Sequence, residues 1–269
     1  MIKLFATDLD GTLLKDHQYV EKENQLAIQS LYNRGIEIAF ATGRTDQDIV
    51  YLFEQLKITG HRVSQNGSYV INDANETIFH QYFSTKIAEM LYERIKDYPA
   101  YYFVTTADQI LFEQEISTIV ELQDLFNHRL IHTDQLNEQI KNQLNVVKFM
   151  LLGEIEQLLL IQSELNEIFK GEVSSVLSAP KCIDVMPTDV NKQVGLTHLI
   201  ETLAIKPEEI AVIGDSQNDI EMLKMTPHSY AMSSADHDVK QAAQHVVDHV
   251  FEAINHLEAN NLLKSTRSI

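Results

Sequence analysis

Two aspartates separated by one residue follow directly after an apolar run near the start of the chain. The run is Ile2 to Ala6, and the acids are Asp8 and Asp10 in the segment FATDLDGTLL. One carboxylate in such a place can attack an electrophile, and a second one two residues later can transfer protons. A polar turn after a strand is the alternative, because Asp and Gly are common in turns. Evidence elsewhere in the chain has to decide between the two.

Two further polar segments follow apolar runs in the same manner. The run that starts at residue 36 ends in Thr42-Gly43-Arg44, and the run EIAVIGD, residues 209–215, ends in Asp215. Ligands of open α/β sheets bind outside the carboxyl ends of the parallel strands. These segments are therefore expected to meet at one edge of a sheet, which disfavours an isolated turn at Asp8.

Four carboxylates would converge at that edge, namely Asp8, Asp10, Asp215 and Asp219. Like charges at short range raise one another's pKa and cost energy unless a cation neutralises them. A hard divalent cation prefers oxygen ligands, and Mg²⁺ suits carboxylates that share it with a phosphate. The sequence therefore predicts Mg²⁺ as the cofactor.

Strand and helix patterns alternate in the first and last parts of the chain. The apolar spacing predicts strands over 2–7, 36–44, 209–215 and 229–233, a hairpin within 62–82, and helices over 23–33, 49–56, 190–205, 218–225 and 236–246. This alternation is typical of a parallel sheet covered by helices. The predicted fold class is α/β, with a Rossmann-like parallel-sheet core.

The middle of the chain has neighbouring strands in pairs instead. The pattern predicts strands over 100–106, 109–114, 145–152, 172–178 and 181–186, and helices over 85–97, 117–127 and 154–169. Paired strands indicate an antiparallel sheet with helices on one face. We therefore expect residues 1–82 and 188–269 to form the core, and residues 83–187 to form an inserted α+β domain.

Composition narrows the possible partners and location. The 269 residues carry a formal net charge of -18, which disfavours nucleic acid and anionic membranes as partners. The single cysteine excludes an intrachain disulfide, and no apolar stretch reaches the ~20 residues of a membrane span. The apolar start is too short for a signal peptide, so a cytoplasmic protein is expected. The oligomeric state does not follow from the sequence.

Four segments, in order, resemble the motifs of the haloacid dehalogenase-like hydrolases of the Cof type. They are DLDGT at 8–12, Thr42-Gly43-Arg44, Lys192 in TDVNKQVGL, and GDSQNDIEML at 214–223. The resemblance covers nearly the whole chain, with an insertion between the second and third motifs. It implies a cap domain over residues 83–187, and a Mg²⁺-dependent phosphatase that hydrolyses a small phosphorylated metabolite, such as a sugar phosphate, through an aspartyl-phosphate.

The resemblance also implies residue roles. Asp8 would be the nucleophile and a metal ligand, and Asp10 the general acid–base group, with its backbone carbonyl on the metal. Asp215 would be the remaining metal ligand, with Asp219 as its outer partner. Lys192 would neutralise phosphoryl charge. The residues expected to contact the phosphate are Thr12, Thr42, Gly43, Arg44, Lys192 and Asn218, of which Thr42 and Lys192 also count as catalytic.

The chain departs from the family pattern in two places. Gln193 stands where the family often has Gly, and Ser233-Ser234 stand where it usually has Gly-Asn after Met. Asn66-Gly67 matches a family turn near the substrate, although Asn-Gly is also an ordinary turn.

Three other functions remain open at this point. Gly-Asp-Ser at 214–216 also occurs in some serine esterases, where Ser216 would be the nucleophile, but the chain lacks their Asp-x-x-His motif. A sugar phosphomutase and a phospho-acceptor switch would both use Asp8.

Two other features of the sequence lie outside the predicted site. His245 and His249 have a spacing that could hold zinc, although a solvated helix face is favoured. Cys182 is expected to be a packed core thiol.

Overall fold

Strands from both ends of the chain share one large sheet in the computed structural model. The structure describes residues 1–16, 18–116, 123, 130–179 and 181–263. The eight strands are β1 Leu4–Thr7, β4 Glu37–Ala41, β5 His61–Ser64, β6 Tyr69–Ile71, β7 Thr77–His80, β14 Ile210–Gly214, β15 Ser229–Met232 and β16 His245–Val247. Their order is β16-β15-β14-β1-β4-β5-β6-β7, parallel from β16 to β5 and antiparallel beyond it. The predicted parallel-sheet core is therefore confirmed.

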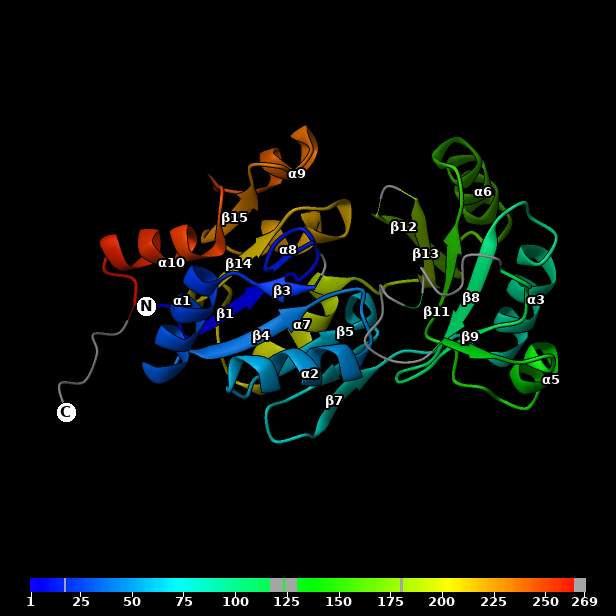
Figure 1. Cartoon of the computed structure of the whole chain (residues 1–269), viewed down its shortest axis with the longest axis horizontal. Helices are drawn as coiled ribbons and strands as arrows, with labels where there is room; N and C mark the ends of the chain where they lie inside the picture. Colours follow the sequence, from blue (N-terminus) through cyan, green and yellow to red (C-terminus); the bar gives the residue numbers. More distant parts are fainter. Residues whose placement is uncertain (17, 117–122, 124–129, 180, 264–269) are drawn as a thin grey trace.

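Helices cover both faces of this sheet (Figure 1). One face packs against α1 Lys22–Asn33, α2 Asp46–Leu56 and α10 Val250–Ala259, and the other against α7 Lys192–Thr202, α8 Ile220–Lys224 and α9 His237–Ala242. Alternation along β1 explains the two layers, because Phe5 belongs to the first apolar cluster, while Leu4 and Ala6 belong to the second. The connections include a small hairpin, β2 Leu14–Lys15 with β3 Tyr19–Val20, and the 3₁₀ turns η1 Gln65–Gly67, η2 Pro207–Glu209 and η3 Gln217–Asp219.

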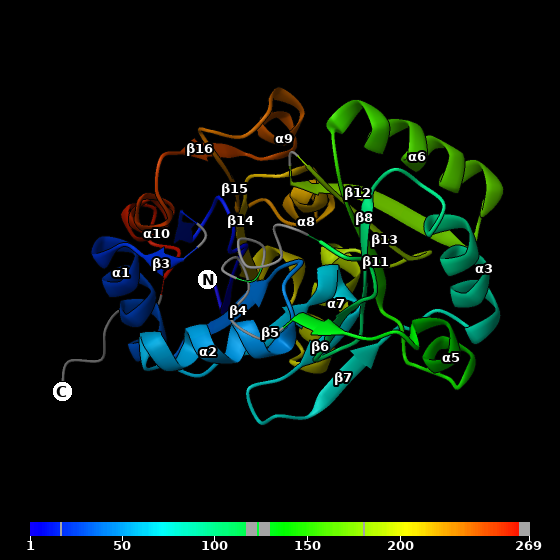
Figure 2. The same ribbon diagram turned by 45° about the vertical axis from the view of Figure 1, so that its right-hand side comes forward.

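A second sheet of six strands comes from the middle of the chain. Its strands are β8 Tyr101–Thr105, β9 Ile110–Phe112, β10 Leu130–His132, β11 Lys148–Leu152, β12 Val173–Ala179 and β13 Cys182–Pro187, in the order β10-β9-β8-β11-β13-β12. Three helices, α3 Thr85–Ile95, α5 Leu136–Lys141 and α6 Ile155–Ile168, pack on one face. Figure 2 shows these helices on the side away from the first sheet. The domain boundaries themselves stay a prediction.

The second sheet differs from its predicted form at one edge. Strands β9 and β10 pair in parallel, so the prediction of an antiparallel sheet is wrong for that pair. The sequence pattern predicted neither β10 nor α5, because both are short. The predicted helix over 117–127 lies outside the described residues. Within the described part of the chain, no helix has both the length and the apolarity needed to cross a bilayer.

The predicted helix over 236–246 is wrong beyond Ala242. Here the chain forms β16, which extends the sheet beside β15, and α10 follows it. His245 and His249 therefore do not share a helix face. The His245 ring packs against His256 with centroids 4.3 Å apart, and His249 contacts Glu21 at 3.4 Å. Among the described residues, the cluster suited to a metal contains neither histidine.

The turn at η1 generates a stability prediction. Gly67 has φ +92°, and a Cβ there would lie 2.2 Å from the carbonyl oxygen of Asn191; Gly171 has φ +82° and nothing within 4 Å. Gly171→Ala is expected to cost about 1–2 kcal/mol from backbone strain alone. Gly67→Ala must add a steric overlap with the start of α7 and should cost clearly more. Urea unfolding of both variants tests this, and equal losses would contradict the close approach.

Candidate active site

The predicted site segments meet at one edge of the first sheet. Asp8 follows β1, Thr42 follows β4 and Asp215 follows β14, and these three strands are parallel neighbours. Carboxylate oxygens of Asp8, Asp215 and Asp219 all lie within 4.8 Å of one another. The parallel order of β14, β1 and β4 therefore brings together acids that are about two hundred residues apart in the chain.

Lys192 lies between two of these acids. Its Nζ donates to Oδ1 of Asp8 and to Oδ1 of Asp219, each at 2.6 Å, and its side chain is fully buried. Lys192 is the first residue of α7, where the helix dipole opposes a cation. The two carboxylates outweigh that effect, because charge-assisted hydrogen bonds in a buried place are strong.

The electrostatics of the cluster are unbalanced. Burial raises the pKa of Asp8 well above its usual range, and Asp219 and Asp215 add to the rise against the opposing effect of Lys192. Burial also raises the pKa of Asp215, as does the charge of Asp219. Burial acts to lower the pKa of Lys192, but Asp219 and Asp8 raise it above its ordinary value. One ammonium thus faces three carboxylates, which leaves an excess of negative charge.

Short polar contacts fix the other members of the cluster. Thr12 Oγ1 donates to Oδ1 of Asp215 at 2.8 Å, and Ser216 Oγ donates to its Oδ2 at 3.1 Å. Oδ2 of Asp219 accepts the backbone N–H groups of Asp215 and Ser216 at 2.9 and 3.0 Å. Gly11 allows this proximity, because a Cβ there would lie 2.4 Å from Asp215. Thr12 therefore orients Asp215 here, and its predicted contact with phosphate stays a prediction.

Asp10 and Arg44 form a bidentate pair. Nε of Arg44 donates to Oδ2 of Asp10 at 2.7 Å, and the Nη2 nitrogen donates to Oδ1 at 2.6 Å. The Asp10 side chain is 32% exposed and that of Arg44 is 11% exposed. Such a fork fixes the orientation of a carboxylate. Arg44 therefore holds the predicted acid–base group, and its predicted contact with phosphate is not tested.

Thr42, in the loop after β4, and Asn218, in η3, contact other polar groups. Oγ1 of Thr42 accepts the backbone N–H of Arg44 at 3.2 Å. Nδ2 of Asn218 donates to Oδ1 of Asn66 at 3.0 Å, and its own Oδ1 is buried without a hydrogen-bond partner among the described residues. Asn66 belongs to the Asn-Gly turn, so this turn is part of the site and more than a surface connection.

Sequence reasoning missed two charged residues beside this site. Lys148 on β11 donates to the carbonyl oxygen of Gly43 at 2.8 Å and to Asp184 on β13 at 3.1 Å. Oδ2 of Asp184 also accepts Nδ2 of Asn66 at 2.7 Å. The Lys148 and Asp184 side chains are 6% and 1% exposed. Each is a single charge within an apolar strand, and that is the signal that could have revealed them.

The two departures from the family pattern lie in local contacts. Gln193 Nε2 donates to Thr197 Oγ1 at 3.1 Å within α7. Ser233 Oγ donates to Asp248, which leads from β16 towards α10. Cys182 is buried, and burial raises the pKa of its thiol to about 12, so the predicted packed core thiol is confirmed.

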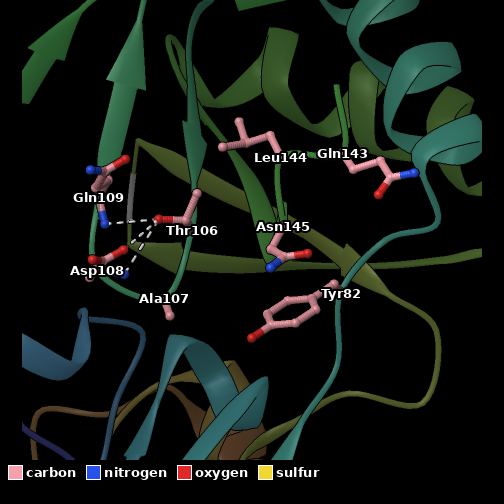
Figure 3. A pocket seen from close by; sticks show the side chains of 8 residues that line it. All are labelled: Tyr82, Thr106, Ala107, Asp108, Gln109, Gln143, Leu144 and Asn145. Atoms are coloured by element: carbon pink, nitrogen blue, oxygen red, sulfur yellow. Dashed lines mark hydrogen bonds between the residues drawn. The ribbon is translucent and has the colours of Figure 1, made fainter. Parts of the chain in front are cut away.

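A cavity of about 320 Å³ lies beside the junction of the two sheets (Figure 3). Tyr82, Thr106 and Asn145 contribute to its wall, and the described residues that line it include none of the predicted site residues. The carbonyl oxygen of Thr106 accepts Nε2 of Gln65 at 3.0 Å. This cavity therefore borders the junction and does not hold the carboxylate cluster.

Known proteins match this chain along nearly its whole length. A family model described as haloacid dehalogenase-like hydrolase matches residues 5–253. The 5-amino-6-(5-phospho-D-ribitylamino)uracil phosphatase YcsE of Bacillus subtilis is 26% identical over 247 residues, covering 92% of this chain and 90% of that protein. The HMP-PP phosphatase of Serratia proteamaculans is 28% identical over 242 residues, covering 87% and 85%. The crystal structure of a haloacid dehalogenase-like hydrolase from Bacteroides thetaiotaomicron superposes with a TM-score of 0.85 at 26% identity, covering 96% of this chain and 100% of that one.

The cluster predicts a pH-dependent effect of removing its cation. Lys192→Met leaves Asp8 and Asp219 buried without their ammonium, which is expected to cost about 3–5 kcal/mol at neutral pH. The loss should shrink as the pH falls through the raised pKa of Asp8, because a protonated carboxyl group no longer needs the cation. Lys224→Met, which removes a half-exposed pair with Glu221, should change stability by less than about 0.5 kcal/mol. Denaturant unfolding at neutral and acidic pH measures both, and a loss that stays constant with pH would contradict the electrostatic cause.

Proposed function

The chain belongs to the haloacid dehalogenase-like hydrolases, and from that premise we propose that it hydrolyses a small phosphorylated metabolite through an aspartyl-phosphate on Asp8. The relatives are named as phosphatases of HMP-PP and of 5-amino-6-(5-phospho-D-ribitylamino)uracil, which supports a small phosphomonoester or a similar phosphate compound. The observation that carries the proposal is the buried carboxylate of Asp8, held at a strand end by Lys192 beside two further acids.

The proposed reaction has two steps. Oδ2 of Asp8 attacks the phosphorus, the bond to the leaving oxygen breaks, and Asp10 gives its proton to that oxygen. Asp10 then takes a proton from water, the water oxygen attacks the aspartyl-phosphate, and inorganic phosphate leaves as the Asp8 carboxylate is restored. The fork of Arg44 on both oxygens of Asp10 holds its ionised form, which is the form that takes the proton from water in the second step.

Neutralisation of phosphoryl charge falls to groups around Asp8. Lys192 supplies a fixed positive charge next to the attacking carboxylate. The hydroxyl of Thr42 accepts a backbone N–H, so its own proton can point to a phosphoryl oxygen. Asn218 uses one N–H on Asn66, and its amide nitrogen carries a second.

The residues at the site fit a divalent cation. Lys192 and two backbone N–H groups occupy both oxygens of Asp219, which suits it to an outer role. Of the two carboxylate oxygens of Asp8, Lys192 donates to Oδ1 and not to Oδ2. Asp8, Asp215 and the backbone carbonyl of Asp10 would hold Mg²⁺, and the excess of negative charge favours it. When bound, Mg²⁺ supplies further neutralisation of phosphoryl charge.

Residues 83–187 form the proposed cap. The six-stranded sheet turns its helix-free face towards the first sheet (Figure 2), and two of its charged residues contact the core at Gly43 and Asn66. Closure of such a cap would exclude water during formation of the aspartyl-phosphate, and reopening would admit water for its hydrolysis. The two chain crossings would act as hinges, the second stiffened by Pro187.

The alternatives differ from this proposal in measurable ways. The esterase alternative would use Ser216, whose Oγ donates to Asp215, as the nucleophile on a carboxylic ester and would release no phosphate. A phosphomutase and a phospho-acceptor switch would use the same Asp8 without a net release of inorganic phosphate. Release of phosphate from p-nitrophenyl phosphate therefore separates hydrolysis from all three.

Replacement of the nucleophile tests the mechanism. Asp8→Asn should abolish hydrolysis of p-nitrophenyl phosphate, because an amide oxygen is a poor nucleophile. Acid-quenched wild-type enzyme should carry a phosphoryl group on the peptide that contains residue 8. Asp238→Asn, at an exposed position of α9, serves as the control and should retain activity. Wild-type turnover in Asp8→Asn would refute the assignment.

Mg²⁺ should stabilise the folded protein as well as activate it. Binding to the native state adds about 2.7 kcal/mol at a concentration one hundred times Kd. Because the pKa values of Asp8 and Asp215 are raised, the stabilisation should be present at neutral pH and fade as the acids are protonated. Thermal unfolding with Mg²⁺ or with EDTA measures this, and Asp215→Asn should lose most of the shift. Full activity after thorough chelation would disprove the need for a metal.

A further inference from the structure

A buried ion pair joins the second sheet to the two loops of the site. Lys148 and Asp184 lie on the sheet face opposite α3, α5 and α6, among residues of a separate apolar cluster that includes Met150 and Cys182. Each member of the pair also bonds to the core, Lys148 to the Gly43 carbonyl and Asp184 to Asn66. The proposed reaction uses neither Lys148 nor Asp184.

The two loops that the pair contacts are bonded to each other. The backbone N–H of Gln65 donates to the Arg44 carbonyl at 2.9 Å, and that of Asn66 donates to the Thr42 carbonyl at 2.8 Å. Gln65 and Asn66 have φ values of 50° and 56°, in the left-handed region. Side-chain-bearing residues keep such a conformation only where surrounding contacts hold it. The contact of Asn66 with Asp184 is one of those contacts.

We propose that Lys148 and Asp184 are positioning residues for the reaction: the pair docks the cap and holds the 42–44 and 65–67 loops, and through Asn66 the side chain of Asn218, in the arrangement that faces Asp8. This inference rests on the proposed function, because it assigns the pair to the same site. Lys148 donates to the carbonyl of Gly43, between Thr42 and Arg44. Its ammonium therefore influences both Thr42, a proposed phosphate contact, and Arg44, which orients Asp10.

A purely stabilising role explains the arrangement less well. Desolvation offsets most of the attraction in a buried ion pair, so such pairs are a weak source of stability. Here Lys148 and Oδ2 of Asp184 are each shared between the ion-pair partner and a core group. Loss of the pair therefore releases the Gly43 carbonyl and the Asn66 amide together. Because both groups belong to the loops and not to a leaving-group contact, the effect should be the same for every substrate.

The test compares single and double variants. Lys148→Met removes the donor to Gly43 and leaves Asp184 charged, whereas Lys148→Met/Asp184→Leu removes both charges and both bonds to the core loops. We expect the double variant to regain thermal stability relative to the single one but to retain a kcat lowered roughly ten- to hundredfold, since small misplacements of reacting groups cost that much. The decrease should be equal for p-nitrophenyl phosphate and for a sugar phosphate, with KM little changed.

A matched control disturbs the cap without touching the core. Glu113→Gln weakens the bonds that Glu113 accepts from Tyr92 and Tyr102 within the second sheet and its helix, and it should leave kcat unchanged. If the double variant recovers kcat along with stability, the pair is only structural and the proposal is wrong. A change in the ratio of kcat/KM between the two substrates would instead make the pair a leaving-group contact, which also overturns it.

Amide hydrogen exchange tests the inference without any turnover. Peptides that contain Gly43 and Asn66 should exchange faster in the double variant than in the wild type and in Glu113→Gln. Unchanged exchange in these peptides would overturn the positioning role even in an active enzyme. Absence of phosphatase activity in the wild type, combined with faster exchange in the double variant, would refute the proposed function and leave the mechanical coupling standing.

Discussion

An excess of buried negative charge at the carboxyl ends of β1 and β14 is the constraint on which the rest of the structure depends. The carboxylates of Asp8, Asp215 and Asp219 lie close together, and Lys192 places a buried ammonium against Asp8 and Asp219. Such a cluster is costly unless the fold imposes it. The parallel order β14-β1-β4 imposes it. The apolar clusters on the two faces of the sheet supply the packing that offsets the cost.

The second sheet contacts the loops beside this cluster through polar groups. Its helices occupy the outer face, so the inner face is available for Lys148 and Asp184 to reach the core loops. Gln65 provides a further contact with the Thr106 carbonyl. Polar contacts of this kind can break and form again at modest net cost, because water replaces them when the parts separate. They would suit the proposed cap, whose junction with the core would open for substrate and product.

Local patterns predicted the long elements well and the short ones poorly. The strand–helix alternation predicted the core, which the structure and the relatives of the same fold confirm. The segment after Ala242 has a helical pattern, but it forms β16, because pairing with β15 satisfies its backbone along the sheet. Helix α5 and strand β10 have too few residues for a periodic pattern to stand out.

The sequence by itself determined the acids, their spacing after apolar strands, and the resemblance of four motifs, because each of these is a local property of the chain. It could not determine which partner each charge takes. Arg44 donates to Asp10, and Thr12 donates to Asp215. Lys148, on the other sheet, donates to the carbonyl oxygen of Gly43. These pairings join residues up to about two hundred positions apart, and they follow from strand order and sheet docking, so only the tertiary structure decided them.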